Sequence, residues 1–185
     1  NAQSMAYIMD TYSMQCGKTI PGVVTGKPIE IGGSPGRSEA TGTGLFFVIE
    51  RGCEVMKYDL RKMTASIQGF GKVGSVIAKK LYQYGTKVIA VSEYNGTLYC
   101  EKGINIEKLL EWIRGGKSFI EYSDDSVKTI PNDKFFKLKC DILVPAATEN
   151  QITKQNADII DCRIILEGAN GPTTPEADVI LEKKG

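Results

Sequence analysis

A glycine-rich turn between a β-prone run and a helical pattern constrains this chain more than any other feature. Residues 63–74 read M-T-A-S-I-Q-G-F-G-K-V-G, and apolar side chains recur at helical spacing over residues 75–84. This order of strand, glycine turn and helix is typical of a dinucleotide-binding βα unit. In such a turn Gly69 permits the tight bend, Gly71 lets the backbone approach a pyrophosphate, and Gly74 lets helix and strand pack closely. We expect the phosphates to bind at the free N–H groups of the helix start.

An acidic residue follows this turn at a suggestive distance. A second β-prone run, residues 87–91, leads into S-E-Y-N-G, and Glu93 lies 24 positions beyond Gly69. In dinucleotide-binding folds a carboxylate about 20 residues downstream binds the adenine ribose. Glycine turns also arise for packing alone, and loop glutamates are commonly solvated, but together the two features favour a coenzyme site. Because a carboxylate repels a 2′-phosphate, Glu93 predicts NAD as the coenzyme, with NADP less favoured.

Composition excludes several classes of protein. The 23 Lys plus Arg and 22 Asp plus Glu give a net charge of +1, and so no reason to expect a nucleic-acid or membrane partner. Five cysteines form no C-x-x-C pair and histidine is absent, so neither a zinc site nor a disulfide framework is indicated. Without histidine the usual general base is also missing. No apolar stretch of bilayer length and no signal sequence is recognisable, so we predict a cytoplasmic location.

The first 62 residues predict leading helices and a loop. A helix ending near residue 17 is indicated by apolar residues at i, i+3, i+4 and i+7. Six glycines and three prolines in residues 17–36 predict a loop. A second helix is predicted to begin at an N-cap Ser38, with Glu39 in its first turn, and to end at residues 51–52. The glycines of residues 32–44 before it would serve either an anion or amide site or a close helix crossing.

From residue 63 onward, strand and helix patterns alternate four times. Such βα repeats predict an α/β, Rossmann-like fold whose mostly parallel sheet is covered by helices on both faces. Residues 1–185 therefore read as one NAD(P)-binding domain, with residues 63–185 as its core. Both ends of the chain resemble interrupted helices, so we expect it to be part of a longer protein. The predicted strands are residues 63–68, 87–91, 141–147 and 163–168, and the predicted helices are residues 75–84, 105–113, 150–157 and those from 174 on.

Ligands of such sheets gather at the carboxyl ends of the strands. The segments at those ends are residues 69–74, 92–94, 145–150 and 167–173, which are rich in small residues and side-chain amides.

Five segments, in order, resemble the coenzyme domain of glutamate dehydrogenases, of the Glu/Leu/Phe/Val dehydrogenase family. The leucine, phenylalanine and valine enzymes are similar in the later segments, but the second segment favours the glutamate branch. The segments are V-T-G-K-P (24–28), G-G-S-P-G-R-S-E-A-T-G-T-G (32–44), I-Q-G-F-G-K-V-G (67–74), P-A-A-T-E-N (145–150) and E-G-A-N-G-P-T-T (167–174).

The resemblance implies reversible oxidative deamination of L-glutamate to 2-oxoglutarate and ammonia, with hydride passing to a nicotinamide. It covers nearly all of this chain but about half of the family's sequence. The family's catalytic lysine and aspartate would lie upstream of Asn1, and a substrate-binding serine segment downstream of Gly185. We therefore expect no catalytic residue here, coenzyme binding without glutamate oxidation, and a hexameric parent that binds the amino-acid substrate.

The same resemblance implies a set of coenzyme-binding residues. The family usually has asparagine at the position of Lys72, which we expect to point into solvent. Two other readings stay open: a different amino-acid dehydrogenase, or a non-catalytic dinucleotide-binding regulatory module. The implied residues are Arg37, the turn residues Gly69, Phe70, Gly71, Lys72, Val73 and Gly74, the ribose-binding Glu93, Ala146 and Ala147 through their backbone, and Thr41 and Asn170 near the nicotinamide.

Overall fold

The computed structural model describes residues 1–185, which form two compact units, Asn1–Thr41 and Gly42–Gly185. The smaller unit contains helix α1 (Ala2–Cys16), capped at its start by the Asn1 side chain and at its end by the left-handed Gly17. The predicted first helix is therefore confirmed. The glycine- and proline-rich stretch after it forms only the short 3-10 helices η1 (Pro21–Val23) and η2 (Ile29–Ile31).

Helix α2 (Ala40–Met56) differs from its prediction at both ends. It begins at Ala40, so the N-cap prediction for Ser38 is wrong and Glu39 precedes the helix. It also continues through Gly52, because Ile49 and Cys53, one turn apart, are both buried in the core. That burial outweighs the cost of about 1 kcal/mol for a glycine inside a helix.

Gly42, in the first turn of α2, marks a close helix crossing. A Cβ added to Gly42 would lie 2.6 Å from the Cβ of Val76 in helix α3 (Gly74–Tyr84), so only glycine permits this approach. Of the two readings for this stretch, the crossing is the one that Gly42 supports. From Gly42 onward, helix α2 therefore belongs to the larger unit. This unit begins upstream of residue 63, the position at which the sequence patterns predicted that the core begins.

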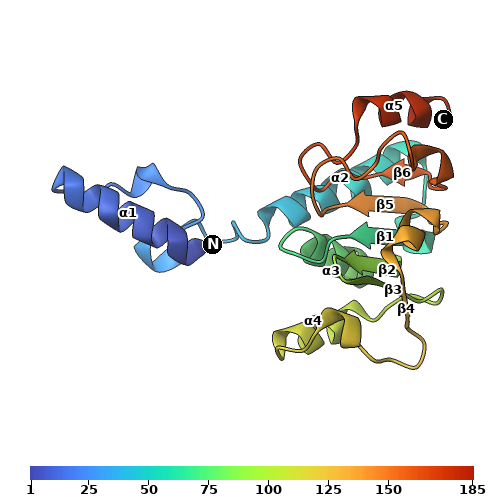
Figure 1. Ribbon diagram of the computed structural model, residues 1–185, viewed down its shortest axis with the longest axis horizontal. Helices are drawn as coiled ribbons and strands as arrows, with labels where there is room; N and C mark the ends of the chain where they lie inside the picture. The colour runs from blue at the N-terminus through green and yellow to red at the C-terminus, as the bar shows by residue number, and fades with distance from the viewer. The chain divides into compact units, whose positions relative to one another are not determined.

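The larger unit is built on a six-stranded sheet in the order β4-β3-β2-β1-β5-β6 (Figure 1). Strands β2, β1, β5 and β6 are parallel, whereas β3 is antiparallel to both of its neighbours. The expected α/β, mostly parallel sheet is confirmed, but the strands β3 and β4 were not predicted. The strands are β1 (Thr64–Gln68), β2 (Lys87–Glu93), β3 (Gly96–Tyr99), β4 (Lys128–Ile130), β5 (Ile142–Pro145) and β6 (Ile164–Ile165).

Both faces of the sheet are covered, as predicted. Alternate strand residues supply two separate apolar clusters: Ala65 and Ile67 of β1 point to one face, and Leu143 of β5 to the other. The first cluster includes residues of α2, α3 and α4 (Ile106–Arg114); the second includes residues of η5 (Asn132–Lys137), η6 (Ala157–Ile159) and α5 (Pro175–Glu182). The remaining short elements are η3 (Leu60–Lys62) and η4 (Phe119–Glu121).

The helix predicted for residues 150–157 is wrong. Asn150 has a left-handed φ of 54°, and its N–H donates to the carbonyl of Gly171 at 3.0 Å. The next two N–H groups both donate to the carbonyl of Pro172, so the donors of a first helical turn pair instead with a neighbouring loop. Side chains cap the starts of the two flanking helices: Asn105 accepts from Lys108 N–H at 3.0 Å, and Thr174 from Ala177 N–H at 3.3 Å.

None of the helices combines the length and the apolar character that crossing a membrane would require.

Candidate functional site

Three central strands end side by side. Gln68, the last residue of β1, is in register with Ser92 of β2 on one side and Pro145 of β5 on the other. The loop after β6 joins them, since the N–H groups of Gly168 and Ala169 both donate to the Pro145 carbonyl, at 2.9 and 3.0 Å. The four segments that the sequence placed at the carboxyl ends of strands therefore follow neighbouring strands.

A groove of about 700 Å³ lies at these strand ends. Of the residues with a predicted role, Gly69, Gly71, Glu93, Ala146 and Ala147 line it. The glycine turn, the end of β2 and the loop after β5 thus contribute to one surface.

The glycine turn has the geometry that its three glycines predict. Gly69 has a φ of +86°, and a Cβ there would lie 2.9 Å from the Ala146 carbonyl oxygen. A Cβ on Gly74 would lie 1.8 Å from the Gly69 carbonyl oxygen, whereas one on Gly71 would meet nothing within 4 Å. Gly69 and Gly74 thus permit close packing, and Gly71 leaves the backbone accessible.

The start of α3 offers free donors. The N–H groups of residues 71–74 find no acceptor within the protein, as is usual for the first turn of a helix. Val73, at the N-cap position, is half-buried and contributes no side-chain cap. Lys72 is exposed and makes neither a hydrogen bond nor an ion pair within the protein, and its orientation into solvent when coenzyme is bound stays a prediction.

Glu93 is the last residue of β2, and its carboxylate accepts a hydrogen bond from the backbone N–H of Phe70. The neighbouring Gly69 N–H donates to the Ser92 carbonyl at 2.7 Å, which ties the turn to the same strand end. The Phe70 ring is buried, with its centroid 6.1 Å from that of Phe119, so Phe70 faces the turn through its backbone and the core through its side chain.

Seven of the twelve predicted residues do not line the groove: Phe70, Lys72, Val73 and Gly74 of the glycine turn, and Arg37, Thr41 and Asn170. Arg37 and Thr41 are exposed residues of the smaller unit, and their coenzyme-binding roles stay predictions. Asn170 is exposed in the loop after β6, which contacts the loop bearing Ala146 but contributes no lining residue at that position.

The sequence did not identify the second wall of the groove. Asn132 and Phe136 from η5, together with Gln151 and Asn156, line that side. Gln68 reaches across to this wall: its Nε2 donates to Gln151 Oε1 at 2.8 Å, while its own Oε1 is buried without a partner. No sequence motif marks these positions. The one available signal is Asn95-Gly96, which is typical of a hairpin and so predicts β3; β4, the strand before η5, pairs with β3.

The residues present fit a dinucleotide. Free N–H groups at a helix start suit a pyrophosphate, a carboxylate beside them suits a ribose diol, and Gln68 Oε1 is an acceptor without a donor. The buried thiol of Cys140 and the half-buried thiol of Cys162 do not suggest nucleophilic chemistry. Desolvation raises the pKa of Cys140 to about 12 and that of Cys162 to about 11, so both stay protonated at neutral pH.

Comparison with known sequences shows which protein family this chain is similar to. The sequence profile described as Glutamate/Leucine/Phenylalanine/Valine dehydrogenase matches residues 32–185. Three similar curated proteins are a glutamate dehydrogenase of Thermotoga maritima (45% identical), an NAD-specific glutamate dehydrogenase of Staphylococcus aureus (43%) and an NADP-specific glutamate dehydrogenase of Synechocystis (42%). Each match covers 100% of this chain but only 44–45% of the relative, so the chain spans less than half their length.

Solved structures agree with the sequences. A hetero-hexameric glutamate dehydrogenase from Thermus thermophilus superposes with a TM-score of 0.88 at 36% identity, over 100% of this chain and 43% of that one. A glutamate dehydrogenase from Plasmodium falciparum superposes equally well, with a TM-score of 0.88 at 27% identity, over 99% of this chain and 41% of that one.

Proposed function

The chain belongs to the Glutamate/Leucine/Phenylalanine/Valine dehydrogenase family, and from this premise we propose that it is the coenzyme-binding half of an NAD-dependent glutamate dehydrogenase. The parent protein would oxidatively deaminate L-glutamate to 2-oxoglutarate and ammonia. The observation that carries the proposal is the Glu93 carboxylate beside the glycine turn with its free N–H groups, where Gly71 and Glu93 both line the groove.

Each part of the groove has its own task in this proposal. The N–H groups of residues 71–74 bind the pyrophosphate, since they have no acceptor in the protein. Glu93 accepts hydrogen bonds from the adenine ribose, and the backbone of Ala146 and Ala147 lines the coenzyme beyond the turn. When bound, the nicotinamide supplies the hydride acceptor. Arg37 keeps its proposed coenzyme-binding role, and Thr41 and Asn170 keep theirs toward the nicotinamide end.

We propose NAD as the preferred coenzyme, although relatives specific for either coenzyme match this chain. A 2′-phosphate would approach the Glu93 carboxylate, and its neighbours Ser92 and Tyr94 offer no cation to compensate for the repulsion. Asp133, which also lines the groove, is itself acidic and so does not compensate for this repulsion.

The remaining proposals concern the parent protein. Its catalytic groups lie outside this chain, its assembly is hexameric and its location is cytoplasmic. The chain alone would bind coenzyme but not oxidise glutamate, because hydride transfer requires a substrate held against the nicotinamide and a base to accept its proton.

Calorimetric titration of the chain with NAD⁺ and NADP⁺ tests the proposal. We expect NAD⁺ to bind about tenfold more tightly, a difference of ~1.4 kcal/mol, and Glu93→Ala to narrow that gap. Glu101→Ala, an exposed glutamate outside the groove, is the matched control and should leave the ratio unchanged. Equal or tighter binding of NADP⁺ would contradict the proposed preference. Glutamate-dependent formation of NADH by the chain alone would show that catalytic groups lie within this chain, contrary to the proposal.

A further inference from the structure

We infer that Asn132 is a positioning residue for coenzyme discrimination, because its side chain holds the hairpin turn that carries Glu93. This inference rests on the proposed function, in which Glu93 distinguishes NAD from NADP. Asn132 is the first residue of η5, separated from the end of β4 by Pro131, and lines the groove together with Glu93 and Tyr94.

The Asn132 amide makes four hydrogen bonds, all to the β2–β3 hairpin. Its Nδ2 donates to the backbone carbonyls of Glu93 and Tyr94, at 2.7 and 3.3 Å. Its Oδ1 accepts from the hydroxyls of Ser92 and Thr97, at 3.2 and 2.8 Å. Since carbonyl oxygens can only accept, the NH₂ group must face them, and this fixes the orientation of the amide.

The two hydroxyls have no alternative partner. Ser92 and Thr97 are buried, lie opposite each other in the β2–β3 ladder, and donate to Asn132 alone. A buried hydroxyl left without a partner is costly, so both hydroxyls hold Asn132 in place. Asn132 in turn holds the carbonyl of Glu93.

The two residues of the hairpin turn itself are exposed. Glu93 pairs with Gly96, which is buried next to the Ile120 side chain, but Tyr94 and Asn95 between them are exposed, Tyr94 to 92%. The Glu93 carboxylate nevertheless reaches the N–H of Phe70 in the glycine turn. Loss of the Asn132 contacts would free the Glu93 backbone and displace its carboxylate, while the N–H groups of residues 71–74, on a different element, would stay in place.

This arrangement predicts a change in discrimination more than in overall affinity. Asn132→Ala removes all four bonds, whereas Asn132→Asp keeps the acceptor for Ser92 and Thr97 but sets a carboxylate oxygen against two carbonyls. The matched control is Asn105→Ala. Asn105 also accepts a hydrogen bond from a backbone N–H, that of Lys108 at 3.0 Å, but it lies outside the groove and makes no side-chain hydrogen bond to the hairpin.

The experiment measures the ratio of NADP⁺ to NAD⁺ dissociation constants by titration of the chain and its variants. We expect both Asn132 variants to lower this ratio several-fold and Asn105→Ala to leave it unchanged. The decisive comparison is in the Glu93→Ala background, where Asn132→Ala should have no further effect on the ratio because the carboxylate it positions is gone. Circular dichroism tests whether each variant is folded. If Asn132→Ala does not fold, Asn132→Asp replaces it in these measurements.

The outcomes separate the inference from the function on which it rests. If the unsubstituted chain binds neither coenzyme, or does not discriminate between them, the proposed function fails and this inference with it. If that chain prefers NAD⁺ but a folded Asn132 variant keeps the full preference, only the inference is overturned. An equal drop in the ratio with and without Glu93 would likewise overturn it, since Asn132 would then act by another route.

Discussion

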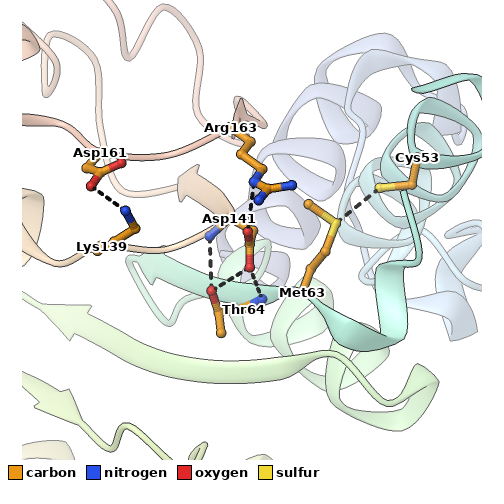
Figure 2. A network of polar contacts seen from close by, with 7 residues as sticks. All are labelled: Cys53, Met63, Thr64, Lys139, Asp141, Asp161 and Arg163. Carbon is orange, nitrogen blue, oxygen red and sulfur yellow. Dashed lines mark hydrogen bonds and ion pairs between the residues drawn. The ribbon is translucent and has the colours of Figure 1, made fainter. Parts of the chain in front are cut away.

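The carboxylate of Asp141 accepts hydrogen bonds from both the backbone N–H and the hydroxyl of Thr64, at 2.8 and 2.9 Å, although the two residues are 77 positions apart (Figure 2). The Asp141 N–H donates in return to the Thr64 hydroxyl at 3.0 Å, and Arg163 Nε lies 3.2 Å from the other carboxylate oxygen. These contacts join the amino ends of β1, β5 and β6, at the opposite end of the strands from the groove.

Asp141→Ala should lower the free energy of unfolding by about 1–3 kcal/mol, because two donors of Thr64 lose a charged acceptor. Asp161→Ala is the matched control: its carboxylate, 3.1 Å from Lys139 Nζ in the same region of Figure 2, belongs to an ion pair in which both side chains are exposed. Its removal should cost less than about 0.5 kcal/mol. Urea denaturation of the three proteins tests this, and equal costs for the two substitutions would refute it.

Gly74→Ala and Gly71→Ala should separate folding from binding. The first places a Cβ 1.8 Å from the Gly69 carbonyl oxygen, so we expect a loss of stability of about 1–3 kcal/mol. The second places its Cβ in open space at the groove, so the fold should be retained while coenzyme affinity falls. Thermal unfolding and calorimetric titration measure the two effects. A stable Gly74→Ala protein would contradict the packing argument, and full affinity in Gly71→Ala would contradict a close approach of the coenzyme.

Lys72→Asn should change coenzyme affinity by less than about threefold, or ~0.7 kcal/mol, because the exposed ammonium has no partner in the turn. The salt dependence of binding should be the same in both proteins. Titration at low and high ionic strength checks this. A larger loss, together with a weaker salt dependence, would mean that the lysine contacts a phosphate and that this departure from the family pattern is functional.

Alkaline pH should destabilise the fold partly through Cys140. Desolvation raises the pKa of its buried thiol from 9.0 to about 12. In the unfolded chain the thiol ionises from about pH 9, while in the fold it stays neutral. Its contribution to stability is therefore present below pH 9 and is lost as the pH rises toward 12, by at most ~1.4 kcal/mol per pH unit. Denaturation across this window should give a shallower decline for Cys140→Ala than for the unsubstituted chain. The exposed Cys16→Ala is the control, and identical slopes for all three would exclude the effect.

The parallel part of the fold could be predicted because its signals are local. The run before Gly69, the helical spacing after Gly74 and the caps Asn105 and Thr174 each define an element with neighbouring residues alone. The strand β3 follows the hairpin signal Asn95-Gly96, which was read only as the end of the preceding strand. β4 has no such signal: its three residues are exposed or half-buried and take their conformation from pairing with β3.

The candidate site also combines residues that local sequence patterns identify with residues that they do not. The glycines and Glu93 were identified from their spacing, and the groove confirms that Gly69, Gly71 and Glu93 lie together. Asn132 could not be found in this way, because its four partners come from a hairpin more than 30 positions earlier. The helix wrongly expected at residues 150–157 failed for a related reason, since its backbone donors pair with Gly171 and Pro172.

The central position of β1 has a consequence for biosynthesis. One edge of β1 pairs with β2, which follows it closely in the chain, but the other edge pairs with β5, which the ribosome adds only after about three-quarters of these residues. Until then the growing polypeptide presents an open, apolar strand edge of the kind on which other chains can pair. We therefore expect the sheet to be completed late in translation, once β5 pairs with β1. Chaperones that bind exposed strands of nascent chains should protect against aggregation chiefly before that point.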